Sequence, residues 1–570
     1  MTTSSGLTLA KGGRTSYVIV LAQDATPAEP RAASELQRFL EESTGAHFPI
    51  VDDVGTPAEH EIMVGRSRHT QALGADVVPG DLGSEEFVVR TVGRRLVIAG
   101  GGTRGTLYGV YRFLEGELGC RWFTARVSRI PRHARLDVGP LDLRGKPVLE
   151  YREPFFREAF DGDWAARNLA NSAHSSLAAI HGGKVRYGPF VHTFETLLPS
   201  KQHFAEHPEW YSEINGTRIS DQPQLCLTNP EVLERVIEGV RRWIRDMPDA
   251  TIFSVSQNDW TNPCQCAKCK AIDDREGSPI GSILTFVNQV AEAIEHEAPH
   301  VAIDTLAYWY SRKPPKTIKP RHNVIVRLCS IECCFAHPLE SDCEANRKFA
   351  DDIREWSRIA DRLYIWDYVT NFHNYIMPWP NFGVLGPNVR FFVRHNVKGI
   401  FEQGSYAGGS GGGEAAEMRA YVLAKLLCDP NVDEQKVRDE FIDGVYGKAA
   451  PYVRRYVDLI HAPVSDPNVH MHIFCDVANP HLTDDVIRRG EELLSEAEAA
   501  AESRAVRERV ERAHLPIQYV RIRKMAADDP ERKKLLDHFL AVAKREDIVN
   551  ISEQHSIATW AEHGAGEPGK

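Results

Sequence analysis

The sequence predicts an α/β protein with a (β/α)8-type barrel, a small α/β domain before the barrel and a helical region after it. Three observations lead to this fold class. Strand-like and helix-like runs alternate over the first 145 residues, strand-like runs then recur between longer helical stretches, and helical periodicity dominates the last part of the chain. We therefore expect three domains, at residues 1–145, 146–413 and 414–570.

The first domain alternates short apolar runs with amphipathic stretches. Strand-like runs occur at residues 16–22, 61–65 and 85–101, and helical periodicity occurs at residues 27–45 and 103–119. Each helical stretch ends at a glycine, where a helix needs a left-handed cap. This alternation predicts a small α/β domain.

The predicted barrel contains six clear strand-like runs, most of which end in polar or acidic residues. Long helical stretches at residues 282–298 and 344–360 separate some of them, as in a parallel α/β barrel. The second and third strands give no clear pattern within residues 164–180 and around 190–194. The six runs are residues 155–160, 251–259, 301–310, 323–332, 362–368 and 397–404.

Composition and charge indicate which classes of molecule the protein can bind. Hydrophobic residues make up 42% of the chain and charged residues 26%, as in a soluble globular protein. The net charge of −11 argues against nucleic acid or an anionic membrane as a partner and favours small molecules or glycans. No export signal and no apolar run of roughly 18 residues is seen. We therefore expect a cytoplasmic protein, as a monomer or a homo-oligomer.

Four of the strand-like runs end in an acidic residue, at Asp259, Glu332, Asp367 and Glu402. The carboxyl ends of barrel strands meet at one mouth, so these acids are expected around a single pocket. For each one alone, a helix cap or an ion pair is the alternative. Glycoside cleavage needs one carboxyl group as proton donor and a second as nucleophile, base or stabiliser. The pattern therefore predicts a glycoside hydrolase that needs no cofactor for catalysis.

Aromatic and polar side chains accompany these acids. Sugar rings present apolar C–H faces that pack on aromatic planes, so the aromatic density favours an oligosaccharide as substrate, although core packing is the alternative for each ring. The candidates for substrate binding are Arg157, His192, Asn258, Trp309, Tyr310, His337, Trp366 and Tyr368.

Three cysteines, Cys264, Cys266 and Cys269, lie close together just after the Asp259 strand end. Closely spaced thiols in a reduced protein point to zinc, and a structural zinc site needs four ligands. We expect a structural zinc here or, alternatively, a cysteine-packed loop at the rim of the pocket. The candidates for the fourth ligand are Cys333, Cys334, Cys343 and His337.

Several segments resemble known glycosidases. The first domain resembles the non-catalytic amino-terminal domain of α-glucuronidases and hexosaminidases. The central part resembles a glycosidase-type family that includes the endo-β-N-acetylglucosaminidases of glycoside hydrolase family 163. The segments that carry these resemblances are residues 32–45, 62–67 and 105–123 for the first, and 192–232, 254–269, 330–339 and 401–406 for the second.

The second resemblance implies cleavage of N-acetylglucosamine-containing glycans, with the acetamido group of the substrate as nucleophile. One carboxylate is then the acid/base and another positions the acetamide. We expect Glu332 as acid/base and Glu402 as its partner, with Asp259 and Asp367 binding or polarising the substrate. Asn258 and Asp259 stand where related hexosaminidases carry an Asp-Glu pair, which departs from their pattern.

Two alternatives stay open. Asp367 with Glu402 also resembles the paired base of inverting α-glucuronidases, and a uronidase would need Arg157 or Arg327 to bind the carboxylate of the sugar. The other alternative is a glycan-binding relative that has lost catalysis.

Overall fold

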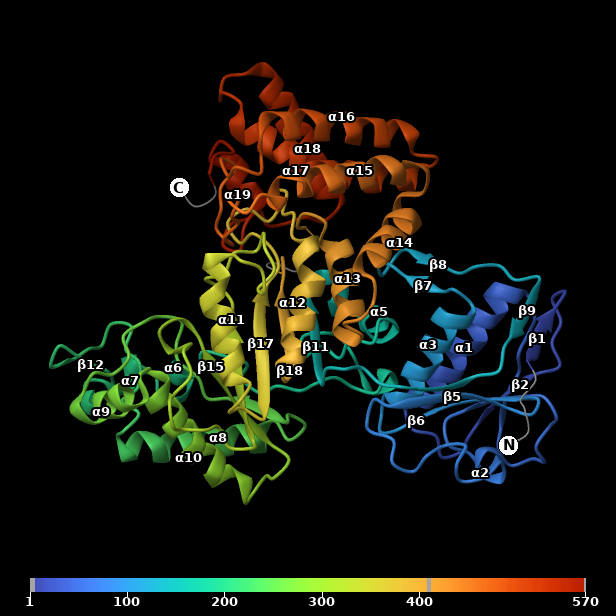
Figure 1. Cartoon of the computed structure of the whole chain (residues 1–570), viewed down its shortest axis with the longest axis horizontal. Coiled ribbons are helices and arrows are strands. Elements are labelled where there is room, and N and C mark those ends of the chain that lie inside the picture. Colours follow the sequence, from blue (N-terminus) through green and yellow to red (C-terminus); the bar gives the residue numbers. More distant parts are fainter. Residues whose placement is uncertain (1–5, 407–411, 568–570) are drawn as a thin grey trace.

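The computed structural model describes residues 6–406 and 412–567, and all structural statements concern these residues. Figure 1 shows three groups of elements: an amino-terminal α/β domain, a central sheet flanked by helices, and a stack of helices from the last part of the chain. Within the described residues, no helix combines the length and the apolar character that are needed to cross a membrane.

The amino-terminal domain is built on a mixed six-stranded sheet with the strand order β10-β5-β6-β4-β2-β3. Helices α1 (Ala28–Thr44) and α3 (Gly105–Glu117) contact each other and this sheet, and Leu36 and Leu107 are fully buried between them and the strands. Gly45 ends α1 with a φ of 72°, the predicted left-handed cap. The other elements are β1 (Leu7–Lys11), β2 (Val18–Leu21), β3 (Ile50–Asp52), β4 (Glu61–Val64), α2 (Arg68–Ala72), β5 (Phe87–Val92), β6 (Arg95–Gly100), β7 (Arg121–Trp122), β8 (Ser128–Arg129), β9 (Arg135–Val138) and β10 (Asp142–Gly145).

The central domain contains a curled, parallel six-stranded sheet with the order β11-β18-β17-β16-β15-β14. Its strands are β11 (Tyr151–Phe155), β14 (Ile252–Ser254), β15 (Ala302–Ala307), β16 (Val324–Cys329), β17 (Arg362–Tyr368) and β18 (Val397–Gln403). The accompanying elements are α4 (Arg157–Phe160), α5 (Gly162–Arg167), α6 (Phe194–Leu197), α7 (Ser200–His203), β12 (Glu213–Ile214), β13 (Thr217–Arg218), α8 (Pro230–Asp246), α9 (Ala267–Glu276), α10 (Ile280–Glu295), α11 (Glu344–Trp356), α12 (Phe382–Arg394) and α13 (Ala416–Cys428). Helices α10 and α11 confirm the two clearest predicted helices.

Side chains alternate between the two faces of this curled sheet. The inner face carries an aromatic cluster that includes Tyr151, Tyr364 and Phe401, whereas Ile365 and Ile400 pack in the outer core against the helices. Consecutive residues of one strand therefore point to opposite sides. This alternation decides which residues near the strand ends reach the interior.

The described residues give this sheet six strands and not the eight of a complete (β/α)8 barrel. Irregular chain lies between β11 and β14. The backbone N–H of Arg152 donates to the side chain of Asn171 (2.9 Å), the N–H of Val185 donates to the carbonyl of Asn171 (3.0 Å), and Tyr187 pairs with Ile252 in an isolated bridge. Single contacts of this kind need no strand periodicity, which explains why the predicted second and third strands have no clear pattern.

The first central strand lies earlier in the chain than predicted. β11 ends at Phe155, and most of the predicted run at residues 155–160 forms the short helix α4. Pro154 is tolerated inside β11 because β11 is an edge strand of the described sheet, where one side of the strand has no ladder to complete.

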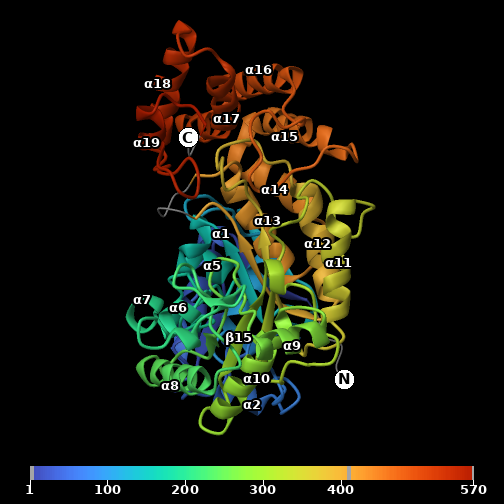
Figure 2. The ribbon, with the colours of Figure 1, turned by 90° about the vertical axis from the view of Figure 1, so that its left-hand side faces the viewer.

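The last part of the chain is helical, as predicted, and Figure 2 shows its helices stacked beyond one end of the central sheet. Two segments between these helices reach the central loops: the N–H of Phe372 donates to the carbonyl of Ile473 (2.7 Å), and the N–H of Tyr375 donates to that of Ile551 (2.8 Å). The helices are α14 (Glu434–Tyr446), α15 (Ala450–His461), α16 (Asp484–Ala500), α17 (Arg504–Lys524), α18 (Pro530–Arg545) and α19 (Ile557–Glu562).

Candidate active site

A cavity of about 400 Å³ lies at the carboxyl ends of the central strands. Its volume falls within the range of roughly 300–1,000 Å³ that is typical of small-molecule sites. Loops of the central domain and segments of the carboxyl-terminal region line it together. The lining residues are Val191, His192, Asp259, Leu306, Tyr308, Trp309, Cys329, Ile331, Trp366, Tyr368, Phe372, Gln403, Tyr406, Ile473, Phe474 and Glu553.

Asp259 is one of two carboxylates among these lining residues. It follows β14, and its side chain is 61% exposed. The hydroxyl of Tyr308 donates to Oδ1 of Asp259 (3.2 Å), and Nε2 of His192 lies 3.9 Å from the same oxygen. Asp259 thus stands at the cavity with a hydroxyl donor and an imidazole beside it.

Glu553 is the second carboxylate, and it comes from the segment between α18 and α19. The Tyr406 hydroxyl donates to Oε1 of Glu553 (2.9 Å), and the backbone N–H of Glu553 donates to the carbonyl of Phe372 (2.9 Å). Burial raises the pKa of Glu553 above its ordinary value; the hydrogen bond from Tyr406 opposes this rise, and the negative charge of Asp259 adds to it. Glu553 therefore keeps a proton to higher pH than an ordinary glutamate.

Aromatic rings form much of the remaining surface. Tyr308 and Trp309 stack with their ring centroids 4.7 Å apart, and Trp309 is 39% exposed. Trp366 and Tyr368 lie nearly parallel, and Nε1 of Trp366 donates to the side-chain oxygen of Gln403 (2.7 Å). These faces are suited to packing against the C–H surfaces of a sugar.

A buried ion pair lies in the interior of the curled sheet. The guanidinium of Arg327 is 3.2 Å from the carboxylate of Asp304, and it lies over the rings of Phe190 (4.5 Å) and Tyr187 (5.0 Å). Arg327 is not among the residues that line the cavity, and its charge is already paired. It is therefore not placed to bind a sugar carboxylate, as the uronidase alternative requires.

The four predicted acids do not surround one cavity, in contrast to the expectation that they lie around a single pocket. Only Asp259 lines it. Glu332 is 51% exposed and pairs with Arg312 (2.5 Å), whereas Asp367 and Glu402 are buried and stand opposite each other in the β17–β18 ladder. The structure therefore brings together Asp367 with Glu402, but separately from Asp259 and from Glu332.

Strand alternation explains where Asp367 and Glu402 lie. Trp366 of β17 packs with Phe401 of β18 at the inner face, so the residue that follows each of them points to the outer face. Oδ1 of Asp367 accepts a hydrogen bond from Ser330 (2.5 Å). Burial, together with the neighbouring charge of Asp367, raises the pKa of Glu402 well above its ordinary value, and burial raises that of Asp367 to about 6.

Replacing Glu402 with Gln is therefore expected to stabilise the protein at pH 7 by roughly 1–3 kcal/mol. Both carboxyl groups bind protons more tightly in the folded than in the unfolded state, so the wild-type protein loses stability as the pH rises above about 4, through about 6 for Asp367 and to higher pH for Glu402. The variant has one buried carboxyl group fewer that must keep its proton on folding, so its stability should fall less over this range. Urea denaturation at pH 5 and pH 7 measures the difference.

Glu59→Gln is the matched control, because Glu59 is exposed and pairs with the exposed Arg94. Its pH dependence should equal that of the wild-type protein. A Glu402→Gln protein that is less stable than wild type at pH 7, with the same loss between pH 5 and 7, would show that Glu402 is not buried beside Asp367 as described.

The other predicted binding residues divide into two groups. His192, Trp309, Trp366 and Tyr368 line the cavity. The remaining four do not line it. Arg157 is ion-paired on α4, and Asn258 is buried and binds backbone groups. Tyr310 packs against the outer core, and His337 belongs to a cluster of cysteines and histidines.

A larger cavity of about 560 Å³ lies between the β7–β8 hairpin and helices α13 and α17. Arg157 lines this cavity, but none of its lining residues belongs to a central strand. Two of its basic side chains pair with acids of the same lining, Arg512 with Glu417 (2.5 Å) and Arg545 with Glu546 (2.7 Å). In parallel α/β folds, function gathers at the carboxyl ends of the strands, so the smaller cavity is the candidate active site.

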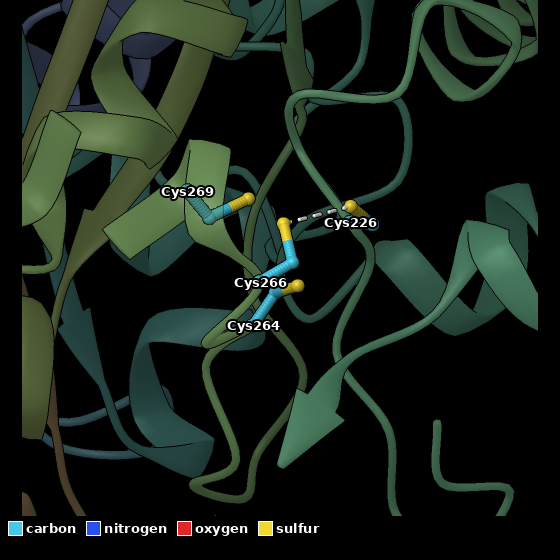
Figure 3. Close-up of side chains that lie close together, drawn as sticks. All are labelled: Cys226, Cys264, Cys266 and Cys269. Atoms are coloured by element: carbon cyan, nitrogen blue, oxygen red, sulfur yellow. Dashed lines mark hydrogen bonds between the residues drawn. The ribbon is translucent and has the colours of Figure 1, made fainter. Parts of the chain in front are cut away.

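The three predicted cysteines form one cluster with a fourth, Cys226, as Figure 3 shows. Cys226 precedes α8, Cys264 and Cys266 lie in the loop after β14, and Cys269 lies in α9. All four are buried, and their sulfur atoms lie within 4.8 Å of one another. Cys226 is thus the fourth member of the cluster. The previously considered candidates, Cys333, Cys334, Cys343 and His337, lie elsewhere, three of them in a second cluster with His470.

Gln403, Tyr406 and Glu553 are among the cavity residues that were not foreseen from the sequence. Gln403 follows directly after Glu402, and the two-residue alternation of β18 could have identified it as the inward-facing neighbour. Glu553 lies in a region where the sequence indicates only helices, and no strand end marks it. Nothing local in the sequence distinguishes it from the exposed acids of the same region.

Comparisons with known proteins agree with a glycosidase-like architecture. Residues 11–113 match the family described as the glycosyl hydrolase family 67 N-terminus. A solved family GH115 4-O-methyl-α-glucuronidase with specificity for decorated arabinogalactans is 11% identical, with a TM-score of 0.56 over 95% of this chain and 78% of that one. CpGH84B is 11% identical, with a TM-score of 0.49 over 98% and 97% of the two chains. At this identity the first similarity shows the fold alone. No curated protein matches the sequence.

A second family match begins at the end of the amino-terminal domain and runs through the whole central sheet. It covers residues 122–458 and corresponds to the family described as a domain of unknown function, DUF4838. This is more than half of the 570 residues. The chain therefore belongs to the DUF4838 family.

Proposed function

We propose that this protein is a glycoside hydrolase whose active site is the cavity at the carboxyl ends of the central strands. The observation that carries the proposal is the presence of two carboxylates, Asp259 and Glu553, on one cavity with aromatic walls. Two such groups are the minimum that most glycosidases need, and barrel enzymes carry their active sites at this end of the strands. The structural similarity to a GH115 glucuronidase supports the same architecture.

The two carboxylates have different surroundings, which suit different roles. Glu553 has a raised pKa, and a carboxyl group that keeps its proton can protonate the oxygen of the leaving sugar. Asp259 is more exposed and accepts a hydrogen bond from Tyr308. Glu553 is thus the proposed general acid, and Asp259 the proposed second carboxylate.

The proposed sugar is N-acetylglucosamine. An acetamido group offers one N–H donor and one carbonyl acceptor. The Asp259 carboxylate offers the acceptor, and the Tyr308 hydroxyl beside it offers the donor once it turns its proton from Asp259 to the substrate. Asp259 would hold the N–H while the acetamido oxygen attacks the anomeric carbon and displaces the leaving sugar, which takes its proton from Glu553. Water would then attack the same carbon, give a proton to the Glu553 carboxylate and restore the acetamido group, so the reaction is substrate-assisted and retaining. The resemblance of the central segments to endo-β-N-acetylglucosaminidases supports the same sugar and cleavage within a glycan.

A uronidase is the second candidate, because the GH115 structure with the similar fold is an α-glucuronidase. A uronate needs a cation for its carboxylate, usually Arg or Lys. Among the described residues that line the cavity, His192 is the only basic side chain. This composition favours the acetamido sugar over the uronate.

Aryl glycosides of β-N-acetylglucosamine and of α-glucuronic acid separate the two candidates. Turnover of the first and none of the second is the expected result, measured by release of the aryl alcohol. The reverse result would identify a uronidase. Glycan binding without release of reducing ends, from aryl glycosides and from oligosaccharides alike, would identify an inactive relative and overturn the proposed catalysis.

A further inference from the structure

Beside the cavity lie two clusters of four thiol or imidazole side chains each, and we propose that each cluster binds one structural zinc ion that holds a wall of the cavity in place. The inference does not depend on the proposed function. The four-cysteine cluster is Cys226, Cys264, Cys266 and Cys269, and the cysteine–histidine cluster is Cys334, His337, Cys343 and His470.

The spacing of the side chains fits a tetrahedral metal. Zinc ligands lie about 2.0–2.3 Å from the ion, so neighbouring ligand atoms are about 3.3–3.8 Å apart. The sulfur atoms of Cys226 and Cys266 are 3.7 Å apart. In the second cluster, the sulfur of Cys334 lies 3.6 Å from Nδ1 of His337 and 3.4 Å from Nδ1 of His470. These three distances match the edges of a zinc tetrahedron, and all ligand atoms of each cluster lie within 4.8 Å of one another.

A disulfide does not account for the first cluster. A disulfide needs a sulfur–sulfur distance of about 2.05 Å, and all eleven cysteines are free. Figure 3 shows that the four sulfur atoms gather at one place although they come from two separate parts of the chain. Four buried thiols of this kind are a donor set for zinc.

The donor sets also indicate what kind of zinc site each cluster is. Four cysteines, or two cysteines and two histidines, fill all four positions of tetrahedral zinc and leave none for water or substrate. Both sites are therefore structural, and neither takes part in the glycosidase chemistry.

Hydrogen bonds around the cysteine–histidine cluster orient its ligands. Nε2 of His337 lies 3.2 Å from the carbonyl of Asp466, so its proton can be donated there while Nδ1 faces the metal. The side chain of Asn346 accepts from the N–H of Cys334 (2.8 Å) and donates to the carbonyls of Cys334 (3.0 Å) and His337 (2.9 Å). The turn between these two ligands is thereby preformed.

The four-cysteine cluster has a similar outer layer. The backbone N–H of Glu213 and the guanidinium of Arg218 both approach the sulfur of Cys264, at 3.5 and 3.6 Å. The hydroxyl of Thr228 lies 3.2 Å from the sulfur of Cys269. Donors directed at sulfur suit thiolates, the form in which cysteine binds zinc.

The first zinc would hold the loop that begins with Asp259. Two residues before Cys226, the side-chain amide of Gln224 donates to the carbonyls of Asn258 (3.1 Å) and Trp260 (2.7 Å) on either side of Asp259. A metal shared by Cys226 and the end of the same loop would complete this attachment. The position of Asp259 at the cavity therefore depends on the four-cysteine cluster.

The second zinc would hold the segment of the carboxyl-terminal region that lines the cavity. His470 lies just before Ile473 and Phe474, which line the cavity. Next to the cluster, the N–H of Phe335 donates to the carbonyl of Met471 (2.8 Å). The metal would thus fasten this segment to the loop after β16.

Metal analysis of the purified wild-type protein tests the proposal without any variant. Mass spectrometry of the elements should find two zinc ions per chain. X-ray absorption should give an average of three sulfur and one nitrogen ligands per zinc, at about 2.3 and 2.0–2.1 Å. Folded protein with less than one zinc per chain, or with ligands that are mainly oxygen, would overturn both sites.

Single substitutions assign each ion. Cys226→Ser and His470→Asn should each lower the zinc content from two to one, whereas Cys475→Ala, which changes a cysteine close to the second cluster but outside it, should keep two. If either ligand variant keeps two zinc ions in folded protein, the corresponding site does not exist as described.

Hydrogen exchange tests the role of the metals in holding the cavity. Removal of zinc by a chelator should speed exchange in residues 258–266 and 466–475, while residues 87–100 of the amino-terminal sheet keep their protection. Unchanged exchange in both loops after complete zinc loss would leave two metal sites but overturn their role at the cavity.

Discussion

Replacing Glu553 with Gln is expected to lower kcat on an unactivated N-acetylglucosaminyl oligosaccharide by about 10²–10⁴-fold. A sugar leaving group needs a proton, and the amide of Gln cannot supply one. An aryl glycoside with an acidic phenol needs this proton much less, so its turnover should fall far less. Rates on both substrates, measured with the same variant, give this comparison.

Asp259→Asn should affect the rates on the two substrates differently from Glu553→Gln. Asp259 is proposed to hold the acetamido group and not to protonate the leaving oxygen, so its loss should lower kcat on both substrates to a similar degree. Glu332→Gln is the control, because Glu332 is exposed, pairs with Arg312 and lies outside the cavity lining. The kcat of this variant should equal that of the wild-type protein. A large loss with Glu332→Gln and none with Glu553→Gln would move the catalytic pair away from this cavity.

Replacing Arg152 with Met is expected to destabilise the protein by roughly 3–5 kcal/mol. Arg152 of β11 is 1% exposed, and its guanidinium binds both carboxylate oxygens of Glu85, at 2.7 and 2.9 Å. The substitution would leave the largely buried Glu85 with Arg104 (2.8 Å) as its remaining arginine. It would also deprive the buried carbonyls of Leu149 and Leu169 of their donor, at the contact between the first domain and the central sheet. Urea denaturation of the full chain measures the loss.

Arg144→Met is the matched control, since Arg144 and its partner Glu86 form a more exposed ion pair, and its loss should cost about 1 kcal/mol or less. The double variant Glu85→Gln with Arg152→Met should lose less stability than the sum of its two single variants. Equal losses for Arg144→Met and Arg152→Met would mean that the buried pair contributes no more than an ordinary surface pair.

Much of the fold could be predicted because most of its elements have a local pattern. The helices α10 and α11, the strands β15 to β18 and the helical last region all follow from hydrophobic periodicity. The irregular chain near Asn171 and Tyr187 could not be predicted, because it meets the edges of the sheet through single contacts and has no periodicity.

The site was predictable only in part, for a related reason. Asp259, Trp366 and Tyr368 reach the cavity because they lie near the carboxyl ends of strands. Glu402 is also close to the carboxyl end of its strand, β18, yet it faces the helices, since a shift of one residue along a strand reverses the direction of the side chain. Its inward neighbour Gln403 lines the cavity instead.

By itself, the sequence determined the class of the fold, most helices and strands, and the presence of acids, aromatic rings and thiols near the ends of central strands. Only the tertiary structure decided which of them meet: Glu553 with Asp259, Cys226 with Cys264, and His470 with Cys334. The physical reason is that periodicity reports burial within one element. Meetings between distant segments depend on how whole helices and loops pack against the sheet, and such packing leaves no local pattern.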